Sequence, residues 1–169
     1  MVASRTDEFA DAVRGVDGSV TRTTAQAFPE TLCDVVADPA VGTPLPFEGV
    51  SYEGTSVDPD PSGSTLAAAR TGVTAGTLGI VEYGSVVLQE TGAGEELLGL
   101  YPELHVVVVA ASDLVPDMPT AYDRLDEQFA DGLDDAIIAT GPSATADMGA
   151  VVTGVHGPRD VHVVVLADR

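Results

Sequence analysis

The sequence predicts an α/β fold with a mostly parallel sheet. Two valine-rich runs, LHVVVVAA at Leu104–Ala111 and VHVVVL at Val161–Leu166, are continuously apolar, as expected of strands covered on both faces. The shorter run at Ala136–Ala139 (AIIA) has the same character. Helical patterns separate these runs, and strands that alternate with helices are typical of parallel sheets. A length of 169 residues fits one domain.

The elements of the N-terminal part follow from apolar spacing and turn residues. Gly18 ends a first amphipathic pattern, and Thr24 is placed to cap a second helix that Asp38-Pro39 stops. Pro, Gly, Ser and Asp dominate residues 41–63, so we expect a surface connection there. The predicted elements are helices over Arg5–Val16 and Thr24–Ala37, a strand over Ser19–Arg22 and a possible strand over Gly49–Glu53.

The second half of the chain is denser in predicted structure. Two short strand runs are hinged at Tyr83-Gly84, and the valine-rich runs then alternate with helices. No stretch is a strong enough boundary for a second domain. The predicted helices are Leu66–Arg70, Gly94–Tyr101, Pro116–Ala130 and Ser143–Val152, and the predicted strands are Leu78–Val81, Ser85–Gln89, Leu104–Ala111, Ala136–Ala139 and Val161–Leu166.

The chain is strongly acidic, with 27 Asp and Glu against 7 basic residues, and a formal net charge of -20. All basic residues are Arg and stand singly, so no basic patch can form and we expect no nucleic-acid partner. Dispersed carboxylates without Lys are typical of halophile proteins, because the Debye length shrinks to roughly 3 Å at 1 M salt. The alternative is a mesophilic acidic protein with a basic partner, which would more often concentrate its charge in one segment.

Cysteine content and hydropathy limit the chemistry and location of the protein. Cys33 is the only cysteine, so the chain can form no intrachain disulfide and no Cys-rich cluster site. Any iron–sulfur cluster must belong to another chain. The N-terminus lacks the apolar stretch of a signal peptide, and no apolar run approaches the roughly 18 residues of a membrane span. We therefore expect a cytoplasmic protein with no membrane span.

The segment Thr140–Asp147 (TGPSATAD) follows a predicted strand and opens a predicted helix. Ligands of open α/β sheets bind beyond the carboxyl ends of strands, and a helix N-terminus with Ser or Thr hydroxyls can hold an anionic oxygen. The candidate ligand-binding residues are Gly141, Ser143, Thr145 and Asp147. The alternative is that Ser143 or Thr145 only caps the helix and Asp147 only favours its dipole.

A glycine-rich stretch over residues 71–85 (TGVTAGTLGIVEYGS) is the second candidate, because glycines permit close approach of backbone to a ligand. Glu82 is the only carboxylate between Thr71 and Leu88, so it is a candidate buried general base or nucleophile. Equally, Glu82 can lie at a strand end in solvent.

The three histidines have no close mutual metal spacing, so we predict no metal site. His156 is the best functional candidate, because its Gly-flanked loop (GVHGP) can present it to a pocket. His105 and His162 each stand second in a valine-rich strand and are interpreted as structural.

Several segments form a recognisable set in their order. They are Gly72-Val73-Thr74, Glu82–Leu88, Leu104–Val108, Val115-Pro116-Asp117, Gly141–Asp147 and Gly154–Pro158. This set resembles the LUD-domain family, and most closely its lactate utilisation protein C, or YkgG, type. The resemblance is clearest over residues 66–167, where the motifs GPSxTAD and GVHGPxxxHVxxL are specific in combination and order.

The resemblance implies a three-layer α/β/α fold similar to the NagB/RpiA/CoA-transferase group. It also implies a role in oxidising L-lactate to pyruvate with partner subunits, of which at least one carries iron–sulfur clusters, while this chain alone binds no cofactor. The alternative is a stand-alone enzyme or sensor for a small anionic metabolite such as an acyl-CoA, a phosphosugar or a nucleotide. The candidates for catalysis are Glu82 and His156, and those for ligand binding are Thr74, Ser85, Gly141, Ser143, Thr145, Asp147 and Gly157.

Overall fold

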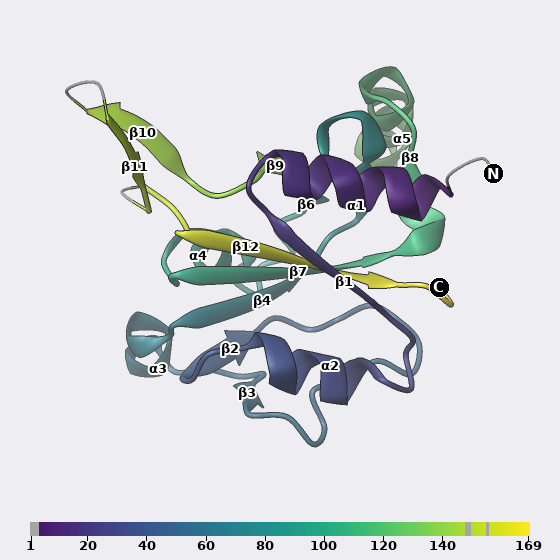
Figure 1. The fold of residues 1–169 in the computed structure, drawn as a ribbon. Coiled ribbons are helices and arrows are strands. Elements are labelled where there is room, and N and C mark those ends of the chain that lie inside the picture. Colours follow the sequence, from purple (N-terminus) through teal and green to yellow (C-terminus); the bar gives the residue numbers. More distant parts are fainter. Residues whose placement is uncertain (1–3, 148–149, 155) are drawn as a thin grey trace.

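A six-stranded parallel sheet forms the centre of the protein (Figure 1). The computed structural model describes residues 4–147, 150–154 and 156–169. The strand order is β1-β12-β7-β4-β2-β3. The strands are β1 (Ser19–Thr23), β2 (Ala40–Gly42), β3 (Val57–Asp58), β4 (Thr71–Ala75), β7 (Leu104–Ala110) and β12 (Asp160–Leu166). The predicted α/β class with a mostly parallel sheet is therefore confirmed.

Helices and a second sheet cover the central sheet (Figure 1). The helices are α1 (Arg5–Gly15), α2 (Phe28–Val35), α3 (Gly63–Ala68), α4 (Glu95–Leu100) and α5 (Met118–Ala130). The second sheet has the order β8-β5-β6-β9, with β5 (Leu78–Ile80), β6 (Ser85–Leu88), β8 (Leu114–Val115) and β9 (Ile137–Thr140). No helix among the described residues is both long and apolar enough to cross a bilayer.

The valine-rich strands are buried on both faces because their alternate residues enter two different cores. Val107 and Val109 of β7 pack in one core with α1 and with β6 of the second sheet. Val106 and Val108 pack in the other core, with α2 and the edge strands β2 and β3. The same alternation on β12 explains why both runs are continuously apolar. A third core lies between the second sheet and α5.

The segment predicted as a helix over Ser143–Val152 is instead a β-hairpin, which extends away from the central sheet in Figure 1. In it, β10 (Ala144–Asp147) pairs antiparallel with β11 (Ala150–Thr153). Thr145 lies opposite Val152, and such cross-strand pairs of β-branched residues favour a sheet over a helix. The helix prediction is wrong, so no helix N-terminus exists at Ser143 to hold an anion.

The Pro- and Gly-rich residues 41–63 are more than a surface connection. They contain most of β2 and all of β3, which extend the parallel sheet at its edge. Val41, Val50 and Val57 are buried in them. The possible strand over Gly49–Glu53 is irregular, because its apolar residue Val50 packs into the core without joining a ladder.

The run Ala136–Ala139 is a strand, as predicted, but it is not covered on both faces. Residues 137–139 belong to β9, the antiparallel edge strand of the second sheet, whose residues are half-buried or exposed. An apolar run of this length does not distinguish a central strand from an edge strand.

Candidate functional site

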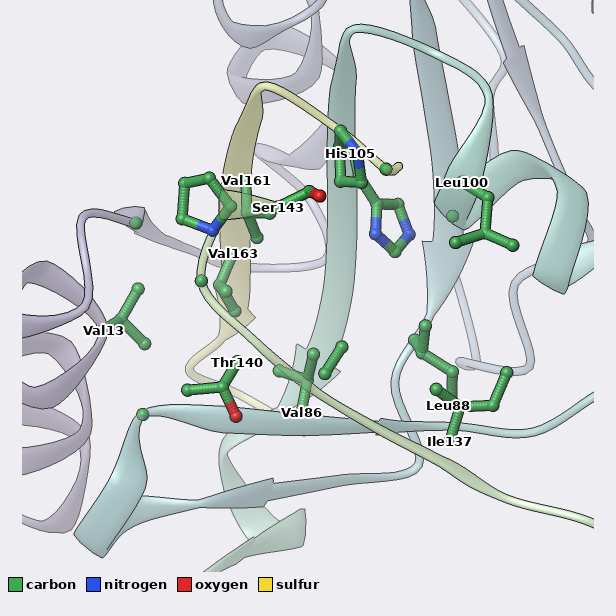
Figure 2. Close-up of a pocket in the computed structure, with 18 of the residues that line it drawn as sticks. Val13, Val86, Leu88, Leu100, His105, Ile137, Thr140, Ser143, Val161 and Val163 are labelled. Carbon is green, nitrogen blue, oxygen red and sulfur yellow. The ribbon is translucent and has the colours of Figure 1, made fainter. Parts of the chain in front are cut away.

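A cavity of about 220 Å³ lies between the central sheet and the second sheet (Figure 2). Leu100 and Ile137 stand at its open side, where they are 45% and 42% exposed. The remaining apolar wall residues are Val13 of α1, Val86 and Leu88 of β6, Ala139 of β9, and Val161 and Val163 of β12. The cavity is thus a largely apolar chamber enclosed by strands from both sheets.

The cavity lies at the amino ends of the parallel strands, opposite to the expected position. His105 and Val161 line it, and each is the second residue of its strand. The segment after β9 reaches this end because β9 belongs to the antiparallel part of the second sheet. The rule that ligands bind beyond the carboxyl ends of parallel strands therefore does not apply to Gly141–Ser143.

Two loops, 141–143 and 156–158, close one side of the cavity. The Ser143 N–H donates to the Pro158 carbonyl over 2.9 Å. A Cβ at Gly157 would lie 2.9 Å from the Cβ of Ser143, so only glycine allows this approach. Gly141 has a φ of +62°, and a Cβ there would lie 2.3 Å from the Val16 carbonyl oxygen. Gly157 is thus required for the two loops to meet, and Gly141 is required for the first loop to pack against Val16.

Six of the predicted site residues lie at this cavity, either in its lining or one hydrogen bond behind the lining. Gly141, Ser143, His156 and Gly157 line it, with His156 exposed at the surface. Thr74 and Ser85 are buried one hydrogen bond behind the lining. The Ser85 hydroxyl lies 2.6 Å from Oγ1 of Thr140, and that of Thr74 lies 2.8 Å from Nε2 of His105. Both Thr140 and His105 line the cavity.

Three predicted site residues have other positions. Glu82 lies in the 3-10 turn Val81–Tyr83, is exposed and is not part of the cavity lining. This corrects its interpretation as a buried base and agrees with the alternative of a carboxylate in solvent. Thr145 is half-buried in β10 and does not line the cavity. Asp147 ends β10, and its side chain lies outside the described residues.

His105 is the lining residue that the sequence interpretation missed. Its side chain is 2% exposed, and burial lowers the pKa of the imidazole to about 4, so the ring is neutral at pH 7. Its register partner in β4 is Gly72, which places Thr74 diagonally across on the same face. A signal existed in the sequence, since a histidine in an otherwise apolar strand needs a polar partner.

The charged groups of the cavity are few. Glu96 is the only carboxylate among its described lining residues, which include no Arg. Within the described part of the chain, no three His, Cys, Asp or Glu side chains are grouped to hold a metal ion. The site therefore offers hydroxyl groups, two imidazoles and backbone groups around an apolar centre.

Comparisons with known proteins give a consistent picture. The family model of the LUD domain matches residues 62–166. Lactate utilization protein C of Bacillus licheniformis is 35% identical over 107 residues, which are 60% of this chain but only 44% of that protein. Lactate utilization protein C of Deinococcus radiodurans is 26% identical over 167 residues, 94% of this chain and 78% of that protein. The uncharacterized protein YkgG of Escherichia coli is 31% identical over 109 residues, 62% of this chain and 47% of that protein.

A solved structure shows the same fold. The crystal structure of a DUF162 family protein from Deinococcus radiodurans superimposes with a TM-score of 0.72 at 21% identity. The superposition covers 98% of this chain and 100% of that one. This chain therefore shares its overall fold with a protein of known crystal structure.

Proposed function

This chain belongs to the LUD domain family, and from that premise we propose that it is a subunit of a system that oxidises L-lactate to pyruvate. In this proposal, partner subunits carry the iron–sulfur clusters that take up the two electrons released. The names of its relatives, lactate utilization protein C, support a role in lactate utilisation. The match to the Deinococcus radiodurans relative extends over 94% of this chain, so the support is not confined to one motif.

At the level of residues, the proposal is supported by the meeting of the two motif loops, 141–143 and 156–158, at one cavity. The cavity is lined by Gly141, Ser143, His156 and Gly157. Thr74 and Ser85, which are far from them in sequence, lie one hydrogen bond behind this lining. Buried hydroxyls that orient lining residues are expected at a working site, where geometry must be held. A lone free cysteine, Cys33, is exposed, so cluster chemistry is assigned to the partners.

An exposed apolar surface on α4 is consistent with a partner subunit. Leu97, Leu100 and Tyr101 are large and exposed, and Tyr101 is 73% exposed. Contiguous apolar residues of this kind mark sites where proteins associate. Leu100 also borders the cavity, so a partner bound to α4 would cover its open side.

The alternative of a stand-alone protein for an anionic metabolite receives no support from the cavity. An anion that leaves water needs a cation or several N–H donors, and the described lining contains one carboxylate, Glu96, and no Arg.

Affinity purification tests the proposal. A tagged chain is expressed in its native host during growth on L-lactate and purified in multimolar KCl, and the co-purified proteins are assayed for iron and acid-labile sulfide. We expect an iron–sulfur protein to accompany the wild type and to be lost with Leu97→Asn/Tyr101→Asn. Tyr122→Asn is the matched control because Tyr122 is 60% exposed but lies on another helix, α5. Recovery of the wild-type chain without any iron–sulfur protein would refute the proposal.

A further inference from the structure

We propose that the cavity binds a compact, uncharged molecule with an apolar body and one carbonyl group, whose oxygen accepts a hydrogen bond from Nδ1 of His105. The proposal concerns the cavity alone and stands whether or not the chain acts in lactate oxidation.

The hydrogen bond between Thr74 and His105 determines which ring nitrogen carries the proton. Both residues are buried, and the Thr74 hydroxyl forms a hydrogen bond of 2.8 Å with Nε2 of His105. A buried hydroxyl hydrogen without an acceptor is unfavourable, so we assign Thr74 as the donor and Nε2 as the acceptor. The proton of the neutral imidazole then resides on Nδ1.

Nδ1 of the ring has no hydrogen-bond partner among the described residues and lies beside Gly99, which lines the cavity as His105 does. Figure 2 shows the imidazole among the side chains that line the cavity. A Cβ at Gly99 of α4 would be 3.4 Å from Cε1 and 3.8 Å from Nδ1. Because Gly99 has no side chain, it leaves the Nδ1 edge of the ring uncovered. An N–H donor that has no partner among the described residues, on an otherwise buried ring, therefore lies beside a space that an acceptor can fill.

The surroundings decide which acceptor fits. The walls are mainly Val, Leu and Ile, and Glu96 is the one charged side chain in the described lining. A carboxylate would lose its hydration without gaining a cation, whereas a carbonyl oxygen needs only the one donor that His105 supplies. This selection arises from desolvation and so persists at high salt, where long-range repulsion is screened.

The size of the cavity suits a small ligand. Its volume of about 220 Å³ is below the roughly 300–1,000 Å³ that is typical of pockets for drug-sized ligands. A single ring with a carbonyl substituent is a ligand of suitable size. Ser143 also points into the cavity in Figure 2 and can bind a second lone pair of the same oxygen.

Three probes of similar shape test separately the need for the carbonyl group and the exclusion of a charge. Acetophenone has the ring and the carbonyl, ethylbenzene has no carbonyl, and benzoate carries a charge. Binding to the wild-type protein is measured by chemical-shift changes in ¹H–¹⁵N spectra that include the imidazole N–H of His105. We expect acetophenone to shift this N–H signal and to bind at least tenfold more tightly than benzoate and severalfold more tightly than ethylbenzene.

Gly99→Leu tests the position, because its side chain would extend into the cavity beside His105. Gly63→Leu is the matched control, since a Cβ at Gly63 meets nothing within 4 Å. We expect loss of acetophenone binding in Gly99→Leu only. Gly99→Ala, whose Cβ makes an ordinary contact, is the milder variant if the leucine impairs folding, and it should weaken binding. The proposal is overturned if acetophenone causes no shift at its solubility limit, if benzoate binds as tightly, or if binding is unchanged in both Gly99 variants.

Discussion

Burial of His105 makes the stability of the protein depend on pH in a defined window. The imidazole has an ordinary pKa of 6.5, and its burial lowers this value to about 4 in the folded protein. Between these two values the unfolded chain takes up a proton that the folded protein does not. Stability is therefore lost as the pH falls from about 6.5 to about 4 and is fully retained above this window.

The two pKa values of His105, 6.5 and about 4, determine the size of the effect. They correspond to a loss of about 2 kcal/mol in the free energy of unfolding at pH 5, and of about 3 kcal/mol at pH 4. A loss of this size is a large part of the total stability of a typical domain, which is about 5–15 kcal/mol. The effect should therefore appear as a clear shift of an unfolding midpoint.

Comparison of the wild type with His105→Gln isolates this contribution. Urea unfolding at constant KCl, followed by circular dichroism, gives the free energy of unfolding of both proteins between pH 7.5 and 4. His162, whose pKa is also lowered by burial, is present in both, so its contribution and those of the carboxylates cancel in the difference. We expect the advantage of the wild type over the variant to shrink by about 2 kcal/mol from pH 7.5 to pH 5. A difference that stays constant within about 0.5 kcal/mol would refute the burial argument.

Further predictions concern glycines, buried hydroxyls and salt. Gly141→Ala should lose about 2 kcal/mol or more in chemical denaturation, because it combines a positive φ with a backbone clash, whereas Gly54→Ala, at φ +81° in open space, should lose about 1–2 kcal/mol. Thr74→Val should destabilise by about 1–3 kcal/mol because it leaves Nε2 of His105 without its partner. Thr43→Val should be neutral or stabilising in the same assay, since the buried Thr43 hydroxyl has no partner among the described residues. The melting temperature should rise from dilute buffer to multimolar KCl, because salt screens a net charge of -20, and a salt-independent value would contradict the halophilic interpretation of the composition.

The sequence predicts β1, β7 and β12 of the central sheet but not β2, β3 and β4. Burial on both faces leaves a direct record in the composition of β7 and β12. The valine runs of β7 and β12 appear as predicted, and α1 and α4 agree with their predicted ranges to within a residue at either end. The hairpin at Ala144–Thr153 was missed because its alanines favour a helix locally, whereas the pairing that makes it a sheet, such as Thr145 with Val152, forms only between the two strands.

Some residues that line the cavity were predictable from the sequence, but the position of the cavity was not. Gly141, Ser143 and Gly157 carry a visible motif pattern, yet their meeting depends on the direction of β9, which a short apolar run does not reveal. The role of His105 depends on the register between β4 and β7, since only that register places Thr74 beside it. Both properties belong to tertiary structure and leave little local signal.

The most direct test of the account measures L-lactate oxidation in the native host. A strain without this chain is complemented with the wild type, with Gly99→Leu or with Gly63→Leu, and the rate of lactate-dependent electron-acceptor reduction is measured in extracts at high salt. We expect activity with the wild type and Gly63→Leu, and none in the deletion strain or with Gly99→Leu. Full lactate oxidation without the chain would contradict its role in lactate utilisation, and full activity with a folded Gly99→Leu protein would show that this role does not depend on the cavity.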